Sequence, residues 1–322
     1  MNKIFNVKDF GAVNDGVTLN SVAVQKAIDE CAAQGGGTVL FSGGDYVLST
    51  VFLKSNVTIR IEKHTRILGA LSFYDYAPEE KIDYPAYQDQ SHTYFDCSMF
   101  VGRDVENIKI CGEGDIDMRS VWDEDNVRGI GGRGPKPIAL KECNNVKIHD
   151  IEINNATDLA IYFAGCDDVE IYNIKMRVYI DGISPDNCKN VYIHDCDVES
   201  GDDGIVMKSS YTLNRLGVCD NIVVRNCRVK GEYLAWYCEN VTFEHCVIIG
   251  TQPLCYCKNL TLIDCEMHEC DLAFERSEVQ ATVTTPVLSI KNPLLGSIVV
   301  PKVGEIIMDL PGALGKIEVK SI

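Results

Sequence analysis

The sequence predicts an all-β fold: a right-handed parallel β-helix, built as one elongated solenoid with a capping helix at its N-terminal end. Two observations support this prediction. A nine-residue motif, in which a Cys and two polar residues precede an alternating apolar strand, recurs six times in register. The copies also follow one another at regular spacing, which is typical of a solenoid. They begin at Cys143, Cys166, Cys188, Cys219, Cys238 and Cys257.

Polarity alternates within each copy of the motif. Val191 and Ile193, for example, alternate with Tyr192 and His194. A period of two places one row of side chains inside the coil and the other outside. An Asn precedes the strand in five copies, and Asn tolerates left-handed backbone and forms local hydrogen bonds. We therefore expect these residues at the coil corners, stacked as a ladder. They are Asn145, Asn190, Asn221, Asn240 and Asn259.

The length of a coil changes along the chain. The first two steps between motif starts are similar, the third (from Cys188 to Cys219) is longer, and the last two are shorter than the first. The long third step holds about nine extra residues, which we expect to project as a loop of the kind that often marks a binding face. We divide the chain into residues 1–228, with coils of about 22 residues, and residues 229–322, with coils of about 19 residues and a C-terminal closure.

The first coil is predicted to carry a helix over Asn20–Ala33. Val24, Ala27, Ile28 and Cys31 recur on one face, and three glycines follow the segment. Such a helix would cover an open sheet edge. At the other end, residues 272–322 contain short β-like runs without recognisable chemistry.

Composition excludes several classes of protein. The formal charge of -17 argues against nucleic acid or an anionic membrane surface as a partner. No apolar stretch is long enough for a membrane helix, and the first ten residues lack the apolar core of a signal peptide. The 15 cysteines are an odd number and follow the repeat, which favours buried, reduced thiols in a cytoplasmic protein. We expect neither a metal nor another cofactor.

Three segments carry a family resemblance. Residues 4–40 are similar to the N-terminal signature of pectin-degrading β-helix enzymes, and the turn GEGDIDMRSVW from Gly112 to Trp122 resembles their glycine-rich turn. The segment IDGISPDNCKNVYIHDCDVESGDDGIVMKS, residues 180–209, resembles the paired catalytic motifs of the polygalacturonase family of glycoside hydrolases. From about residue 229 the chain looks instead like an uncharacterised bacterial family of short-coil β-helix proteins. We interpret it as a composite of the two.

Asp181, Asp202 and Asp203 form the candidate catalytic group. The sequence separation of Asp181 and Asp203 equals the local coil length from Cys166 to Cys188, so the two should be neighbours on adjacent coils. Three carboxylates this close cannot all ionise normally, so the pKa of at least one should be raised. Glycoside hydrolysis needs such a protonated acid and a carboxylate that activates water. The resemblance implies an inverting mechanism, with Asp202 as the acid and Asp181 and Asp203 holding the water. On spacing alone, an acidic turn remains the alternative.

The chain departs from the family pattern at the substrate-binding positions. Gly231-Glu232-Tyr233 stands where the family has His-Gly, its cationic Arg-x-Lys motif has no counterpart, and Tyr179 replaces an Asn. Lys208 and Arg215 are the nearest basic residues on the long coil and are candidates to bind an anionic sugar, with Tyr179 beside them.

Two functions therefore compete. The first is a glycoside hydrolase acting on anionic, pectic oligosaccharides, the expected partner. The second is a non-catalytic β-helix with a structural or saccharide-binding role. The intact aspartates favour the first, and the replaced His-Gly favours the second.

Overall fold

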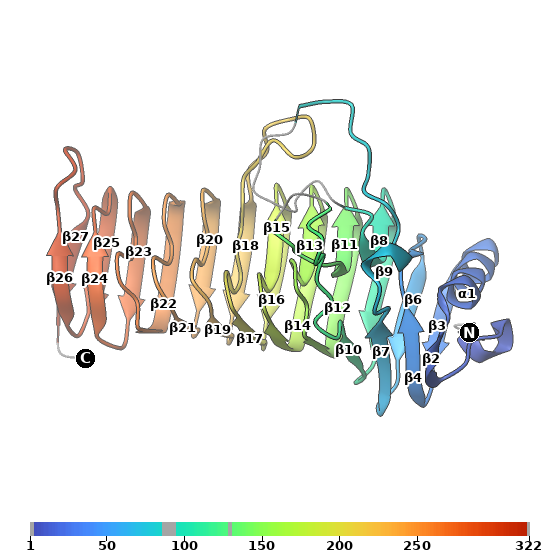
Figure 1. The fold of residues 1–322 in the computed structure, drawn as a ribbon. Coiled ribbons are helices and arrows are strands. Elements are labelled where there is room, and N and C mark those ends of the chain that lie inside the picture. Colours follow the sequence, from blue (N-terminus) through green and yellow to red (C-terminus); the bar gives the residue numbers. More distant parts are fainter. Residues whose placement is uncertain (1–2, 86–94, 128–130, 321–322) are drawn as a thin grey trace.

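A computed structural model describes residues 3–85, 95–127 and 131–320. It shows a row of strands side by side, with α1 (Ser21–Ala33) at the N-terminal end (Figure 1). Every pairing between its named strands is parallel. The prediction of an all-β chain with an N-terminal helix is confirmed.

The strands form three sheets. The largest has twenty strands. They are β1 Ile4–Asn6, β2 Asp15–Leu19, β3 Gly37–Phe41, β4 Gly44–Leu48, β6 Val57–Ile61, β7 Thr65–Gly69, β9 Glu106–Cys111, β10 Asp115–Asp117, β12 Asn144–Asn154, β14 Asp167–Val178, β16 Lys189–His194, β17 Asp197–Ser200, β18 Asp220–Arg225, β19 Arg228–Lys230, β20 Glu239–Glu244, β21 Val247–Ile249, β22 Lys258–His268, β23 Glu278–Val283, β25 Leu295–Val300 and β27 Lys316–Val319. The second sheet has β5 Val51–Phe52, β8 Ser98–Arg103, β11 Lys136–Lys141, β13 Ile161–Ala164 and β15 Ile183–Asp186, and the third has β24 Val287–Lys291 and β26 Val303–Ile307.

The pairing register follows the sequence repeat. The residue three places after each motif Cys pairs with its equivalent in the next copy, so the pairing steps equal the spacings between the motifs. The extra residues of the long third step belong to residues 209–218, which contain no strand and rise from the strand row beside β18 (Figure 1). The column of paired residues runs through Ile108, Val146, Val169, Val191, Ile222, Val241, Leu260 and Val279, all of them buried.

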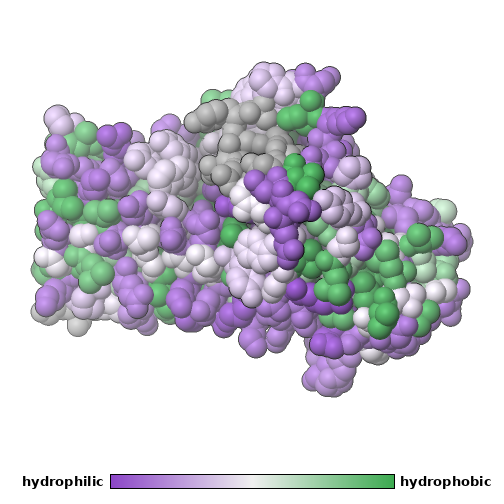
Figure 2. All heavy atoms as spheres, in the orientation of Figure 1, coloured by the Kyte–Doolittle hydropathy of each residue, from purple (hydrophilic) through white to green (hydrophobic). Residues whose placement is uncertain are grey.

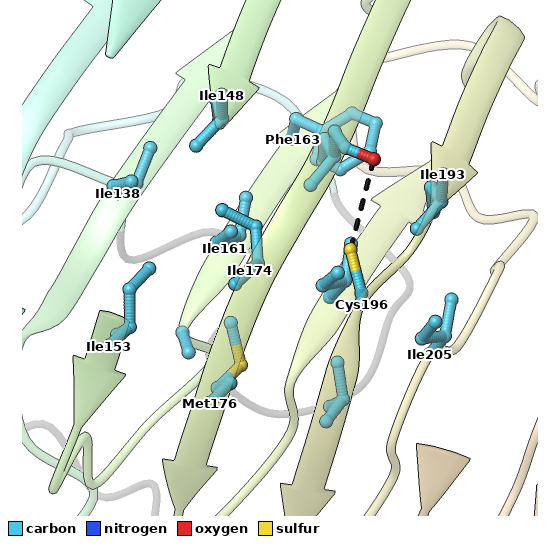
Figure 3. Close-up of a cluster of buried hydrophobic side chains, with 14 of the residues drawn as sticks. Ile138, Ile148, Ile153, Ile161, Phe163, Ile174, Met176, Ile193, Cys196 and Ile205 are labelled. Atoms are coloured by element: carbon cyan, nitrogen blue, oxygen red, sulfur yellow. Dashed lines mark hydrogen bonds between the residues drawn. The ribbon is translucent and has the colours of Figure 1, made fainter. Parts of the chain in front are cut away.

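The main apolar cluster is continuous and runs from Phe5 to Val300, and a second, smaller buried cluster includes Phe95, Tyr162 and Leu213. Figure 3 shows part of it, with Ile138, Ile161 and Ile174 among the side chains that fill the space between the sheets. All 15 cysteines are buried free thiols, as the repeat-locked positions predicted. On the face shown in Figure 2, hydrophobic residues are mixed with polar ones and gather toward the N-terminal coils.

The asparagine ladder is also confirmed. The five motif asparagines have φ between 50° and 56°, in the left-handed region. Their side chains link successive coils: Asn221 donates to Asn190 at 2.6 Å, and Asn259 donates to Asn240 at 2.6 Å. These bonds satisfy polar groups at the corner of each coil and reinforce the register set by the strands.

The N-terminal helix begins one residue later than predicted, and its predicted apolar face is buried. Asn20 occupies the N-cap position but makes no side-chain hydrogen bond to the helix, because its amide side chain exchanges hydrogen bonds with the Val13 backbone instead. In the described part of the chain, no helix is long and apolar enough to cross a membrane.

Candidate active site

The three predicted aspartates lie at the ends of two strands that pair with each other. Asp181 follows β14 and the pair Asp202 and Asp203 follows β17, while Val178 of β14 is the register partner of Ser200. Beyond the strands the alignment continues, because the Gly182 amide donates to the Asp203 carbonyl at 2.8 Å. One turn of the coil therefore brings Asp181 beside Asp203, as predicted.

Close approach of the two coils requires glycine here. A Cβ at position 182 would lie 2.4 Å from the carbonyl oxygen of Gly204, closer than real side chains come. The glycines beside the aspartates thus let the two backbones approach until their carboxylates share one site.

One oxygen from each of the three carboxylates lies within 4.8 Å of those of the other two. Asp181 and Asp203 are 2% and 5% exposed, whereas the side chain of Asp202 is 37% exposed. All three line a hollow of about 430 Å³ that is open to solvent. Its other lining residues are Arg133, Val206, Lys208, Tyr233 and Trp236.

Burial and mutual repulsion shift the protonation of the inner pair. Burial, and then the charge of Asp181, raises the pKa of Asp203 to about 8. Burial also raises the pKa of Asp181 to about 6, against the opposing effect of the Lys208 ammonium. The expected raised pKa is therefore present, and near neutral pH the inner pair holds about one proton between its two carboxyl groups.

Two cations face these carboxylates. Lys208 Nζ lies 3.9 Å from Asp181 Oδ2 and 3.7 Å from Asp203 Oδ2, so it lies beside the inner aspartates, while its role in binding substrate stays a prediction. Arg133 Nη2 lies 3.6 Å from Asp202 Oδ2, and its Nη1 lies 4.0 Å from Asp158 Oδ1. Asp158 is itself buried and paired with buried Lys136 at 2.9 Å. A chain of ion pairs thus runs from the interior to Asp202.

Sequence reasoning missed Arg133, because the segment before β11 belongs to no copy of the repeat. The one available signal was a basic residue among the glycines of the stretch GGRGPK, beside the recognised turn ending at Trp122. Arg133 supplies a positive charge to the hollow from a segment in which the sequence predicted no site residue.

The other two predicted binding residues lie farther out. The Tyr179 hydroxyl accepts a hydrogen bond from Ser120 Oγ at 3.2 Å, and its ring lies 5.8 Å from that of Trp122, so it stands at the margin of the site. Arg215 pairs with Glu142 at 2.8 Å and lines a separate hollow of about 500 Å³. Arg215 is therefore outside the aspartate hollow, and its role in binding substrate stays a prediction, as does that of Tyr179.

The coil beyond the aspartates contributes backbone and aromatic rings. The Tyr233 amide donates to Asp203 Oδ1 at 3.2 Å, so the segment that replaces His-Gly holds an aspartate through its main chain. The Tyr233 ring contacts that of Trp236 edge to face at 5.0 Å. The hollow is thus polar at its base and aromatic on the side of the short coils.

Among the described residues, the three aspartates are the one group of at least three His, Cys, Asp or Glu side chains placed to ligate a single ion. The Lys208 ammonium lies within 4 Å of two of them, where it supplies the positive charge that a cation would otherwise bring. This charge pattern fits proton transfer between carboxyl groups better than metal ligation.

The chain is similar to known polygalacturonases. It is 26% identical over 220 residues to a probable polygalacturonase of Vitis vinifera, and this alignment covers 63% of this chain and 44% of the relative. It is 24% identical over 252 residues to an exo-poly-alpha-D-galacturonosidase of Dickeya chrysanthemi, over 63% of this chain and 41% of the relative. The chain thus spans less than half the length of these two curated relatives. The predicted family resemblance is confirmed.

Among solved structures, a hyperthermoactive exopolygalacturonase from Thermotoga maritima matches with a TM-score of 0.73 at 18% identity, over 95% of this chain and 89% of that one. This likeness concerns the fold. A family model described as "Protein of unknown function (DUF3737)" matches residues 119–314, which hold the aspartates, both cations and the coils of both lengths. The chain therefore belongs to the DUF3737 family.

Proposed function

We propose that this chain is a glycoside hydrolase that acts on galacturonide-type saccharides. The supporting observation is the solvent-open hollow in which three carboxylates of unequal burial face two cations. The coils that form it are interpreted as a right-handed parallel β-helix, the hand that parallel crossover connections adopt almost without exception.

In this proposal Asp202 is the general acid, because it is the most exposed of the three and therefore the most accessible to a leaving glycosidic oxygen. Asp181 and Asp203 share about one proton, so the inner pair carries one negative charge to accept a proton from the attacking water. Water held by this pair attacks the anomeric carbon, and Asp202 donates its proton to the leaving glycosidic oxygen.

Arg133 and Lys208 support an acidic sugar as the substrate. A guanidinium binds a carboxylate through two parallel hydrogen bonds, and the Lys208 ammonium adds a point charge. A uronate bound to Arg133 would take the place of Asp202 as partner of that cation. The negative charge then beside Asp202 would favour its protonated form, which the general acid requires.

The separation of the carboxyl groups bears on whether hydrolysis inverts or retains the anomeric configuration. Acid and base carboxyl groups of inverting glycosidases usually lie about 6.5–9.5 Å apart, and those of retaining enzymes about 5 Å. The separations of up to 4.8 Å between oxygens here resemble the second class. Inversion therefore rests on the family resemblance and on a water bound by two inner carboxyl groups instead of one.

The experiment is hydrolysis of galacturonan and rhamnogalacturonan oligomers by the purified chain, beside the Asp202→Asn variant. We expect reducing-sugar release, a loss of at least about 10³-fold in kcat with Asp202→Asn, and an α-to-β change in the first anomer seen by proton NMR. Arg133→Gln should raise KM for acidic oligomers about tenfold or more. Arg225→Gln serves as the matched arginine control, because Arg225 pairs with Glu244 and does not line the hollow.

A non-catalytic saccharide-binding chain is the second candidate, favoured by the replacement of His-Gly with Glu232-Tyr233. Binding of acidic oligomers without any release of reducing sugar by the wild-type chain would establish it and rule out the hydrolase. Retention of the anomeric configuration would rule out the inverting mechanism alone.

A further inference from the structure

Four aromatic side chains form a continuous surface beside the hollow, which we term the aromatic wall: Tyr233, Trp236, Tyr237 and Tyr256. Trp236 is its centre, with ring centroids 5.0 Å from Tyr233, 5.7 Å from Tyr237 and 4.9 Å from Tyr256. Tyr237 and Tyr256 stack on each other at 4.7 Å with their planes 13° apart. The four rings therefore form one packed unit, not separate surface residues.

The wall leads away from the aspartates along the stack of coils. Tyr233 and Trp236 line the aspartate hollow, whereas Tyr237 lies outside it. Trp236 pairs with Cys255 of the next coil, which places Tyr256 one coil farther toward the C-terminus. Adjacent coils are about 4.8 Å apart, so a step of one coil is comparable to the width of a sugar ring.

The backbone at the wall adopts a conformation that large side chains rarely take. Tyr237 and Tyr256 have φ of 51° and 58°. Coil corners elsewhere in the chain carry mostly Asn or Asp at such angles, residues that tolerate left-handed backbone. Ala235, Leu254, Phe274 and Arg276 also have positive φ, so this conformation belongs to the corner of the short coils. What distinguishes Tyr237 and Tyr256 is that their rings stack on each other across two successive coils. Tyr237 is 51% exposed, so its ring is accessible.

The charges around the wall differ from those in the hollow. Glu232 is adjacent to the wall at one end, and Glu275 is close to Tyr256 at the other, where the Arg276 guanidinium lies 5.9 Å from the Tyr256 ring centre. Burial, followed by the negative charges of Glu232, Asp203 and Asp202, raises the pKa of Tyr233. Glu275 is itself paired with Lys291 at 3.2 Å, which offsets its charge. Binding at the wall therefore depends on its rings more than on charge, which favours an uncharged ring over a second uronate.

We propose that the aromatic wall is a second sugar-binding subsite, which packs against an uncharged pyranose ring joined to the acidic sugar in the hollow. The inference rests on the proposed function, since the acidic sugar places the ligand. The C–H bonds on one side of a pyranose ring are apolar and pack against aromatic rings, while its hydroxyls reach the tyrosine hydroxyls at the ring edges.

The test is calorimetric titration of the Asp202→Asn variant, which does not consume its ligands. Galacturonic acid, digalacturonic acid and a disaccharide of galacturonic acid with a neutral hexose are the three probes. We expect the mixed disaccharide to bind about tenfold more tightly than the monosaccharide. Adding Tyr237→Ala should abolish this gain without changing the affinity for galacturonic acid, and Tyr237→Phe should preserve it.

Tyr192→Ala is the matched control, because Tyr192 is also part of a ring stack, with His194 at 4.3 Å, and lines a different groove. It should leave all three affinities unchanged. A gain that persists in the Tyr237→Ala, Tyr256→Ala double variant overturns the inference, as does a larger gain for digalacturonic acid. Failure of galacturonic acid to bind at all overturns the proposed function first, and with it the subsite.

Discussion

Asp203 has the higher raised pKa of the two inner aspartates of the site. It is 5% exposed, lies beside Asp181 and accepts a hydrogen bond from the Tyr233 amide. Its pKa of about 8 in the folded chain compares with an ordinary value of 3.8. Between these two pH values the folded state binds more protons than the unfolded state, so the free energy of unfolding falls as pH rises from about 4 to about 8.

Asp203→Asn should remove this fall in the free energy of unfolding. The amide oxygen can still accept from Tyr233, and no charge remains to be buried. We expect the variant to be more stable than wild type by about 2 kcal/mol at pH 8, with little difference at pH 4, where wild-type Asp203 is already neutral. Denaturant unfolding across this pH range measures the effect.

Asp195→Asn is the control of opposite sign. Hydrogen bonds from His194 and Asn226 lower the pKa of Asp195, so its carboxylate contributes stability above its ordinary pKa, and the substitution should slightly destabilise the chain at neutral pH. An Asp203→Asn variant that is less stable than wild type at pH 8 would mean that the carboxylate is well accommodated as an anion.

Among single residues, the sequence predicted the positions of those that the repeat determines. The coil length placed Asp181 beside Asp203 and brought Lys208 to the same site. The positions of Arg133 and Arg215 could not be predicted in the same way, because each lies in a segment without strand pairing. In such a segment, counting residues does not tell which way a side chain points. The raised pKa values of Asp181 and Asp203 depend first on burial, which the spacing alone does not give.

The elements of this chain are held together by side-chain columns as well as by strands. The first Cys of each motif copy forms a stack that we term the thiol column. In it, the Cys143 amide donates to Cys166 Sγ and the Cys188 amide donates to Cys219 Sγ, both at 3.4 Å. Both the thiol column and the asparagine ladder were predictable because a single strict motif specifies them. The aromatic wall was not, since its rings come from segments between the motifs.

We predict that the thiols are chemically silent in the folded protein. Burial raises the pKa of Cys219 and of Cys270 to about 12, so both remain protonated at pH 8, and the thiolate is the reactive form. A thiol-specific disulfide reagent should modify fewer than about one cysteine per native chain and all 15 after denaturation.

Lys189→Cys, one residue from buried Cys188 and on the exposed surface, provides the positive control and should react at once. Rapid modification of several thiols in the native protein, with unchanged circular dichroism, would show that the column opens to solvent.

For the whole molecule, stability should behave as a sum over neighbouring coils. The contacts that define the stack connect each coil to the next, and the register pairing of Leu260 with Val279 continues the step of the short coils. One family model covers residues 119–314 and so includes coils of both lengths. The division at residue 228 remains a prediction about the origin of the two parts, whereas the stacking of their coils is continuous.

Continuous stacking leads to a test by excision of a coil. Removing residues 258–276 joins Cys257 to Ser277, which then takes the position of Lys258. Val279 then takes the position of Leu260 and Ala281 that of Leu262, so the inward row is kept up to the register shift that follows Leu262. We expect this variant to unfold cooperatively, with a Tm within about 10 °C of wild type. It should also retain the activity of the hollow, whose lining ends at Trp236.

Removing only residues 258–267 leaves about half a coil, so the following strand meets its neighbour out of register and exposes its apolar row. That variant should lose cooperative unfolding, as followed by thermal circular dichroism. Equal stability of the two deletions would contradict a body made of stacked coils of fixed register.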